Sequence, residues 1–283
     1  NEHIVDVTDM GDLPDGAPFL VMEVLRGEAL ASLMDDLGPL PVGRAATITR
    51  QVCAALQAAH DKGIVHRDMK PENVFLTTRG GDPDFVKVLD FGISKMHEHG
   101  KNDRGLTRTG VAMGTPSYMS PEQAQGSKDV DARTDVWAVG VMLYELLVGS
   151  RPFEADSYPM MLMAIVGRDP EPVRYFRRDV PEALDRIVLR CLEKPVGTRM
   201  QSMRDLSEAL GPFVSITGEP DMVAPDAGSD RRGVATSAPR RKSKAPVSEP
   251  PPEDRAQRAV AGTEMVPSEP PPPPTGARTS ADA

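Results

Sequence analysis

The most informative part of this chain is one stretch, His66-Arg67-Asp68-Met69-Lys70-Pro71-Glu72-Asn73, followed by a second one, Asp90-Phe91-Gly92. The first stretch contains an acid, a lysine and an asparagine at fixed spacing, and the second adds another acid. Seven specified residues at background frequencies of about one in twenty would coincide roughly once in a billion starting positions. Chance therefore does not explain the pattern, and we expect these residues to act together.

Four polar side chains in these stretches suit the transfer of a phosphoryl group from a magnesium-bound nucleotide to a hydroxyl. Such a transfer needs an acceptor oxygen in line and positive charge around the phosphate. The Asp68 carboxylate can accept a hydrogen bond from the acceptor hydroxyl, and Lys70 supplies charge. Asn73 and Asp90 offer oxygen atoms, the ligands that Mg²⁺ prefers. A single loop Asp is more often a turn or cap acid, but the four residues together favour catalysis.

Both stretches resemble those of the eukaryotic-type (Hanks-type) protein kinases, in particular the serine/threonine branch. The resemblance covers roughly residues 3–213, and its further motifs are Gly114-Thr115-Pro116, Ser120-Pro121-Glu122, Asp135-Val136-Trp137 and a late Arg199. The many small residues and the Pro-rich tail look like a bacterial member. The resemblance implies an enzyme that transfers the γ-phosphoryl group of ATP to serine and threonine hydroxyls of proteins, with ATP and Mg²⁺ as cofactors.

The family resemblance assigns a role to each residue of the reacting centre. It implies that Asp68 is the catalytic base, with Lys70 beside the transferring phosphate and in contact with the nucleotide. Asn73 and Asp90 are the implied magnesium ligands, and both also contact the nucleotide. Thr115 is implied to contact Asp68 and Lys70, where it would help to select a serine or threonine acceptor.

Other residues near the centre are implied to support or regulate it. His66 and Phe91 are interpreted as packing residues, with a catalytic His66 as the minority alternative. Arg67 is a permanent cation that can hold a phosphorylated residue and so order the activation segment. Thr107 and Thr109 lie where related bacterial kinases autophosphorylate, and the alternative is two unmodified loop threonines.

The adenine-binding hinge is implied at the end of a predicted strand. By resemblance, backbone groups of Glu23 and Leu25 pair with the purine edge, and Met22 lines the pocket behind it. Phe75 and Leu89 are implied to sandwich the base. Taken without the resemblance, apolar residues of this kind would be interpreted as core.

Three residues are interpreted as architectural. Glu122 and Arg199 match the buried ion pair that anchors the activation segment in the family, and such a pair is costly to break from one side. Asp135 is implied to hold the backbone of the catalytic loop. One departure is the run of residues 194–199, KPVGTR, where the family usually has Asp-Pro a few residues before the arginine. A local difference in that turn is therefore expected.

We predict an α+β, protein-kinase-like fold in which a mainly helical C-lobe follows the last strands of a small N-lobe sheet. The predicted domains are an N-lobe and hinge remnant at residues 1–26, a C-lobe at 27–213 and a disordered Pro-rich tail at 214–283. Phe213 is the last aromatic residue, and 13 of the 28 prolines lie beyond it. Apolar patterning predicts strands at 3–9, 18–25, 74–77 and 85–89, and helices at 28–37, 44–62, 134–149, 181–194 and 202–213.

Charge and composition exclude several classes of function. The net charge of −9 argues against general affinity for nucleic acid. The basic cluster at residues 240–244 is interpreted as a solvated linker, with docking on an acidic partner or lipid as the alternative. No window approaches 18 apolar residues, and no signal peptide is recognised. We expect a cytoplasmic protein, and membrane attachment of a longer form stays open.

The cysteines and the other histidines suggest no further site. Cys53 and Cys191 are interpreted as buried free thiols in a reducing compartment. The remaining histidines lack the spacing of a metal site and are interpreted as ordinary: His3, His60, His97 and His99. The implied partners are protein substrates with serine or threonine acceptors, and a second copy of the chain for trans-autophosphorylation.

No G-x-G-x-x-G motif and no V-A-I-K lysine occur in these 283 residues. The interpretation is an N-terminally truncated sequence of a working kinase, which alone would show little or no activity. The alternative is a catalytically inactive truncated kinase that acts as a binding scaffold. A small-molecule phosphotransferase shares the Asp and Asn chemistry, but the long segment at residues 90–122 argues against it.

Overall fold

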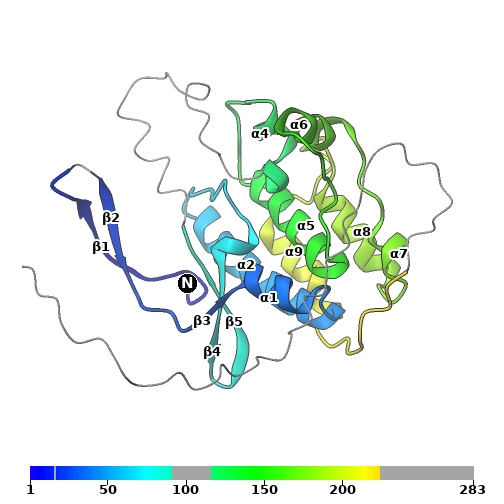
Figure 1. Ribbon diagram of the computed structural model, residues 1–283, viewed down its shortest axis with the longest axis horizontal. Helices are drawn as coiled ribbons and strands as arrows, with labels where there is room; N and C mark the ends of the chain where they lie inside the picture. Colours follow the sequence, from blue (N-terminus) through cyan, green and yellow to red (C-terminus); the bar gives the residue numbers. More distant parts are fainter. Residues whose placement is uncertain (16, 91–115, 224–283) are drawn as a thin grey trace, which may run out of the picture. The chain divides into compact units, whose positions relative to one another are not determined.

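The computed structural model describes residues 1–15, 17–90 and 116–223. All of them belong to the first of two units into which the chain divides, Asn1–Val234 and Ala235–Ala283. In this unit a group of helices lies beside two small antiparallel sheets (Figure 1). The result is the predicted α+β class, with mostly helical residues in its C-terminal part.

The two antiparallel sheets contain β1 (Val7–Asp12) and β2 (Pro18–Met22) in one, and β3 (Gly27–Ala29), β4 (Val74–Arg79) and β5 (Asp82–Val88) in the other. Pairing of β1 with β2 agrees with the two neighbouring strands predicted from the sequence. The strand β3 was not predicted, because its three residues pair with the distant β4 and carry no alternation of their own.

The helices, with the short 3₁₀ turns marked η, are α1 (Leu30–Leu37), α2 (Val42–His60), η1 (Pro71–Asn73), η3 (Pro116–Tyr118), α4 (Pro121–Ala124), α5 (Arg133–Val148), α6 (Tyr158–Gly167), α7 (Val173–Phe176), α8 (Glu182–Cys191), α9 (Met203–Leu210) and η4 (Gly211–Phe213). Four of the five predicted helices match α2, α5, α8 and α9 closely, and α1 begins slightly later than predicted because β3 takes the preceding residues. The helix α6 was missed, although Ser157 caps its first turn and Pro159 is its second residue.

The core is organised around α5, which lies among the other helices (Figure 1) and has nearly all of its residues buried. A helix that is apolar all round belongs in the interior, and α5 packs against both α2 and α8. Trp137 stacks on Phe153 with ring centroids 5.8 Å apart. Gly140 permits the close approach of α8, because a Cβ atom there would lie 2.5 Å from Cβ of Cys191. Cys191 and Cys53 are buried free thiols, as predicted.

The predicted boundary after Phe213 is wrong, because the folded part continues at least to Val223. The carbonyl of Ile216 accepts a hydrogen bond from the backbone N–H of Gly43 at 3.1 Å. The N–H of Val223 donates to the carbonyl of Phe176 at 2.7 Å. Composition did not reveal this segment because backbone hydrogen bonds and only two apolar side chains that pack on the core, Val214 and Ile216, hold it. The predicted tail from residue 224 lies outside the described residues.

Within the described ranges, no helix combines the length and the apolar character that crossing a membrane requires.

Candidate active site

The predicted catalytic loop, residues 66–73, connects α2 to β4 and ends in η1. The side chain of Asp68 is 67% exposed, and its Oδ2 atom lies 3.0 Å from Nζ of Lys70. An exposed carboxylate with a cation beside it is accessible to a hydroxyl from another molecule. The loop thus presents an acid and a lysine together at the surface.

Asn73, the last residue of the loop, is hydrogen-bonded back to the middle of the loop. Its Nδ2 atom donates to the carbonyl of Asp68 at 2.7 Å, and its own carbonyl accepts from the N–H of Leu89 at 2.9 Å. Because the amide nitrogen is used in this bond, the amide oxygen is the atom that could bind a metal. Asp90 follows directly on Leu89, so two oxygen donors come from adjoining backbone segments. Mg²⁺ is usually held by one or two such groups together with phosphate oxygens, and this donor set fits that ion.

Asp135, at the start of α5, connects the catalytic loop to the core. Its side chain is 1% exposed. The Oδ2 atom accepts from the N–H of His66 at 2.9 Å, and Oδ1 accepts from the N–H of Arg67 at 2.8 Å. Oδ2 also lies 2.7 Å from Nε2 of His60, the last residue of α2. A buried carboxylate is stable only when it is well hydrogen-bonded, and here its partners are the loop itself and His60.

His66 joins the two informative stretches of the sequence. Its ring is buried, and Nε2 lies 2.9 Å from the carbonyl of Leu89. The N–H of Asp68 points to Nδ1 of the same ring at 3.4 Å. A carbonyl can only accept and an N–H can only donate, so these contacts assign the donor role to Nε2 and the acceptor role to Nδ1. The ring therefore lies between the loop and the end of β5.

Two residues of the site have a strained backbone. Arg67 and Asp90 have φ angles of 66° and 54°, and they are the non-glycine residues with positive φ in the described part of the chain. Such conformations cost roughly 1–3 kcal/mol each and persist where the surroundings over-determine them. Arg67 directly precedes Asp68, the predicted catalytic base, and Asp90 is itself a predicted magnesium ligand.

Glu122 and Arg199 form a buried ion pair between α4 and the turn before α9. Nη1 and Nη2 of Arg199 lie 2.8 and 2.9 Å from the two carboxylate oxygens of Glu122. The arginine side chain is 0% exposed and that of Glu122 is 13% exposed. Burial alone would raise the pKa of Glu122, but the hydrogen bonds from Arg199 hold it below its ordinary value of 4.5.

The turn at residues 194–199 encloses the same guanidinium despite its departure from the family pattern. Arg199 donates to the carbonyls of Glu193, Lys194 and Arg133 at 3.0, 3.2 and 2.9 Å. All five N–H groups of the guanidinium therefore have partners. Burial lowers the pKa of Lys194 to about 8, and its Nζ lies 4.0 Å from the ring centroid of Phe153.

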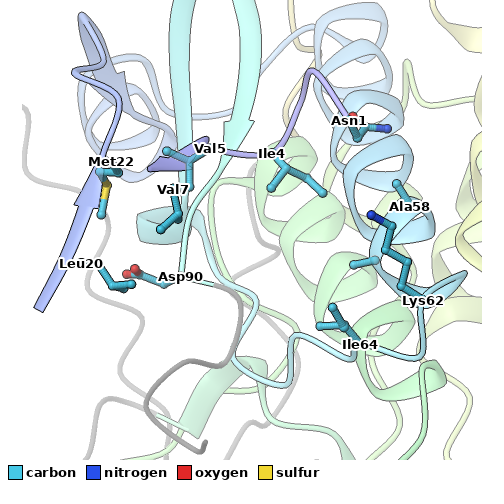
Figure 2. Close-up of a pocket in the computed structure, with 11 residues that line it drawn as sticks. Asn1, Ile4, Val5, Val7, Leu20, Met22, Ala58, Lys62, Ile64 and Asp90 are labelled. Carbon is cyan, nitrogen blue, oxygen red and sulfur yellow. The ribbon is translucent and has the colours of Figure 1, made fainter. Parts of the chain in front are cut away.

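The predicted hinge residues divide between two hollows. Met22 and Asp90 line a cavity of about 300 Å³, and Figure 2 shows both near Leu20. Glu23 and Leu25 line a separate hollow of about 540 Å³. The N–H of Glu23 already donates to the carbonyl of Asp6 at 3.0 Å.

For Glu23, the carbonyl is therefore the group that could serve the predicted adenine contact. The two residues predicted to sandwich the base belong to the three-stranded sheet or follow it. Phe75 is the second residue of β4 and pairs with Ala29 of β3, and Leu89 comes directly after β5. Both of these side chains are half-buried. Phe91, Thr107, Thr109 and Thr115 lie outside the described residues, so their predicted roles stay predictions.

Sequence reasoning missed two side chains of the site. His60 was interpreted as ordinary, yet it contacts Asp135. Gln123 was not considered, yet its Nε2 donates to the carbonyl of Arg67 at 2.8 Å. A signal for Gln123 was present, because Ser120 and Gln123 have the spacing of a capping box, and both bonds of that box are formed. His60 has no comparable local signal, since its partner is 75 residues away.

Comparison with known proteins identifies the family. The sequence model described as "Protein kinase domain" matches residues 1–209. The chain belongs to this protein kinase family. It is 39% identical to the serine/threonine-protein kinase pkn3 of Myxococcus xanthus, over 87% of this chain and 45% of that protein. It is 38% identical to the serine/threonine-protein kinase PknD of Mycobacterium tuberculosis, over 73% of this chain and 30% of that protein.

These relatives confirm the predicted family and its bacterial character, and the chain spans less than half of their length. A solved structure, Rad53 1–466 in complex with AMP-PNP, matches with a TM-score of 0.60 and 22% identity. The match covers 76% of this kinase-family chain and 51% of the Rad53 chain. At this identity the match shows a shared fold, which confirms the predicted fold class.

Proposed function

We propose that this chain carries the acceptor and metal side of a serine/threonine protein kinase site, which transfers the γ-phosphoryl group of ATP to protein hydroxyls. The observation that carries the proposal is the exposed Asp68 carboxylate, 3.0 Å from Nζ of Lys70, on a loop held by the buried Asp135. The names of the bacterial relatives support the same chemistry and the same acceptors.

On the acceptor side, the substrate hydroxyl donates a hydrogen bond to Asp68, which orients the oxygen toward the phosphorus and takes up its proton. Lys70 lies beside this carboxylate and neutralises charge on the transferring group. The bond from Asn73 to the carbonyl of Asp68 limits movement of the loop during this step. A base positioned in this way typically contributes about 10²–10⁴-fold to the rate.

On the metal side, the amide oxygen of Asn73 and the carboxylate of Asp90 would hold Mg²⁺ together with the phosphates of ATP. The ion supplies charge neutralisation for the phosphate oxygens. Asp90 has a φ angle of 54° and lies two residues after the end of β5. The protein partners are substrates with serine or threonine acceptors, a second copy of the chain included.

Reading the gene upstream of Asn1 separates a working kinase from an inactive scaffold. An in-frame G-x-G-x-x-G followed by a lysine and a glutamate would support the enzyme. A stop codon immediately before a nearby start would favour the scaffold. The apolar side chains exposed on β1 and β2, Met10 and Val21 among them, are the observation that keeps the scaffold as the second candidate.

The direct test is phosphate transfer by the product of the complete reading frame, with labelled ATP, Mg²⁺ and a generic acceptor protein. We expect label on serine and threonine, and a loss of about a hundredfold or more in Asp68→Asn. Asn73→Ala and Asp90→Ala should also weaken the Mg²⁺-dependent binding of a nucleotide. Label that persists in Asp68→Asn, or that appears on other residue types, would overturn the proposal.

A further inference from the structure

Gln123, the third residue of α4, bridges two parts of the site through the two ends of its amide. Its Nε2 atom donates to the carbonyl of Arg67 in the catalytic loop at 2.8 Å. Its Oε1 atom accepts from the N–H of Ser120, the N-cap of α4, at 3.0 Å. A carbonyl can only accept and a backbone N–H can only donate, so both partners require this one orientation of the amide.

The carbonyl that Gln123 holds belongs to the peptide group that precedes the catalytic carboxylate. Arg67 has a φ angle of 66°, a conformation that side-chain-bearing residues adopt at a cost. Its N–H is bound by Asp135 at 2.8 Å, and its carbonyl is bound by Gln123. Both backbone polar groups of the strained residue are thus fixed by side chains from elsewhere, and the next residue is Asp68.

The donor is itself anchored to the core. Oγ of Ser120 lies 2.7 Å from Oγ1 of Thr134, and both residues are buried. Thr134 is the neighbour in sequence of Asp135, which holds the N–H of Arg67. Two neighbouring residues at the start of α5 therefore both act on Arg67. Asp135 binds its N–H directly, and Thr134 binds Ser120, whose N–H in turn holds the Gln123 amide that binds the Arg67 carbonyl.

We propose that Gln123 is a positioning residue for phosphoryl transfer, an inference that rests on the proposed function. Through its bond to the Arg67 carbonyl, Gln123 makes the orientation of the Asp68 carboxylate depend on whether residues 116–124 are packed in their present position. When those residues leave their place, the carbonyl of Arg67 loses its donor, and the strained peptide before Asp68 is free to turn. Gln123 touches no reacting atom and acts only through the backbone of the loop.

Gln123→Glu separates the two bonds of this side chain. The glutamate is isosteric and keeps an oxygen for the N–H of Ser120, and glutamate is favoured at this position of a capping box. A negative charge also suits the N-terminus of a helix. The variant nevertheless loses the N–H donor and turns a carboxylate oxygen toward the carbonyl of Arg67. The fold should therefore be retained while the bond to the loop is lost.

Gln125→Glu is the matched control. It makes the same chemical change two residues further on, at the exposed C-cap of α4. The bond to the loop is made by Gln123, and the capping box by Ser120 and Gln123, so the side chain of Gln125 takes part in neither. Gln123→Met, which lacks both polar ends, completes the series.

The first measurement is hydrogen exchange, read by mass spectrometry on the full 283-residue chain. We expect the amides of Arg67 and Asp68 to exchange roughly tenfold faster in Gln123→Glu and unchanged in Gln125→Glu. The amides of α4 should keep their protection in both variants. Unchanged exchange in the loop, or a general loss of protection across α4, would overturn the proposal.

The second measurement is steady-state kinetics on the product of the complete reading frame. We expect kcat to fall roughly tenfold in Gln123→Glu, with the KM for ATP and for the acceptor protein unchanged. A rise in KM at constant kcat would assign Gln123 to substrate binding and contradict positioning. If the wild-type protein transfers no phosphate, the proposed function fails, and the exchange measurement alone decides whether Gln123 holds the loop.

Discussion

The catalytic loop rests on buried side chains whose polar groups are bonded, whereas the hairpin β1–β2 presents apolar side chains to solvent. Asp135, which binds the N–H groups of His66 and Arg67, is 1% exposed. Arg199, which binds Glu122 in the neighbouring α4, is 0% exposed. Met10 and Val21 of the hairpin are 61% and 44% exposed. Local stability follows the density of buried contacts. The described residues therefore hold the loop that we propose as the acceptor side, and the hairpin depends far less on its side chains for folding.

The largest effect is expected from Arg199→Met, which leaves Glu122 buried without its partner. Breaking a buried pair from one side costs about 3–5 kcal/mol in the free energy of unfolding. Urea denaturation at pH 7 measures this loss. The control is Arg186→Met, which breaks an exposed i,i+4 pair with Glu182 and should cost at most about 0.5 kcal/mol. Equal losses in the two variants would contradict the comparison.

The same pair predicts how stability depends on pH. The folded pKa of Glu122 lies below its ordinary value of 4.5, so the unfolded chain binds more protons in the acid range. Its contribution to stability is present above pH 4.5 and is lost as the pH falls through the folded pKa. The difference between wild type and Arg199→Met should therefore narrow below about pH 4.5. A difference that stays constant down to pH 3 would show that charge pairing is not its cause.

A smaller effect is expected from His60→Leu. The change removes one donor from the buried Asp135 carboxylate but leaves the two backbone donors in place. A buried acceptor that loses a partner costs about 1–3 kcal/mol. His60→Gln retains an N–H donor, and we expect it to recover part of the loss in urea denaturation. Similar losses in both variants would assign the effect to packing of the ring rather than to the hydrogen bond.

The loop at residues 66–73 could be recognised in the sequence because its polar residues are close together, with Asp68, Lys70 and Asn73 within six positions, and their catalytic roles stay predictions. Long amphipathic helices such as α2 could also be predicted, since their apolar spacing is regular. The pairing of β3 with β4 and the contact of His60 with Asp135 could not be predicted in this way. They depend on residues that are distant along the chain, and no local pattern marks them.

The hinge illustrates a different limit. The family resemblance indicated Met22, Glu23 and Leu25 as one adenine-binding segment, but these residues face two separate hollows. Met22 is the last residue of β2, whereas Glu23 and Leu25 lie in the non-strand segment before β3, so these neighbours in sequence need not share a pocket. A role carried by backbone groups, as proposed for Glu23 and Leu25, leaves no trace in the residue types themselves.

The smallest effect on folding is expected from Met10→Lys in β1. The side chain is 61% exposed, so the substitution should change the free energy of unfolding by no more than about 0.5 kcal/mol. Its consequence should appear in association instead, because β1 and β2 form a sheet of two strands and lysine on a strand edge disfavours pairing with another chain. Light scattering over a concentration series should show less self-association than in wild type. A loss of stability as large as that of Arg199→Met would mean that the hairpin is as tightly integrated as the loop, and the contrast between the two regions would then be lost.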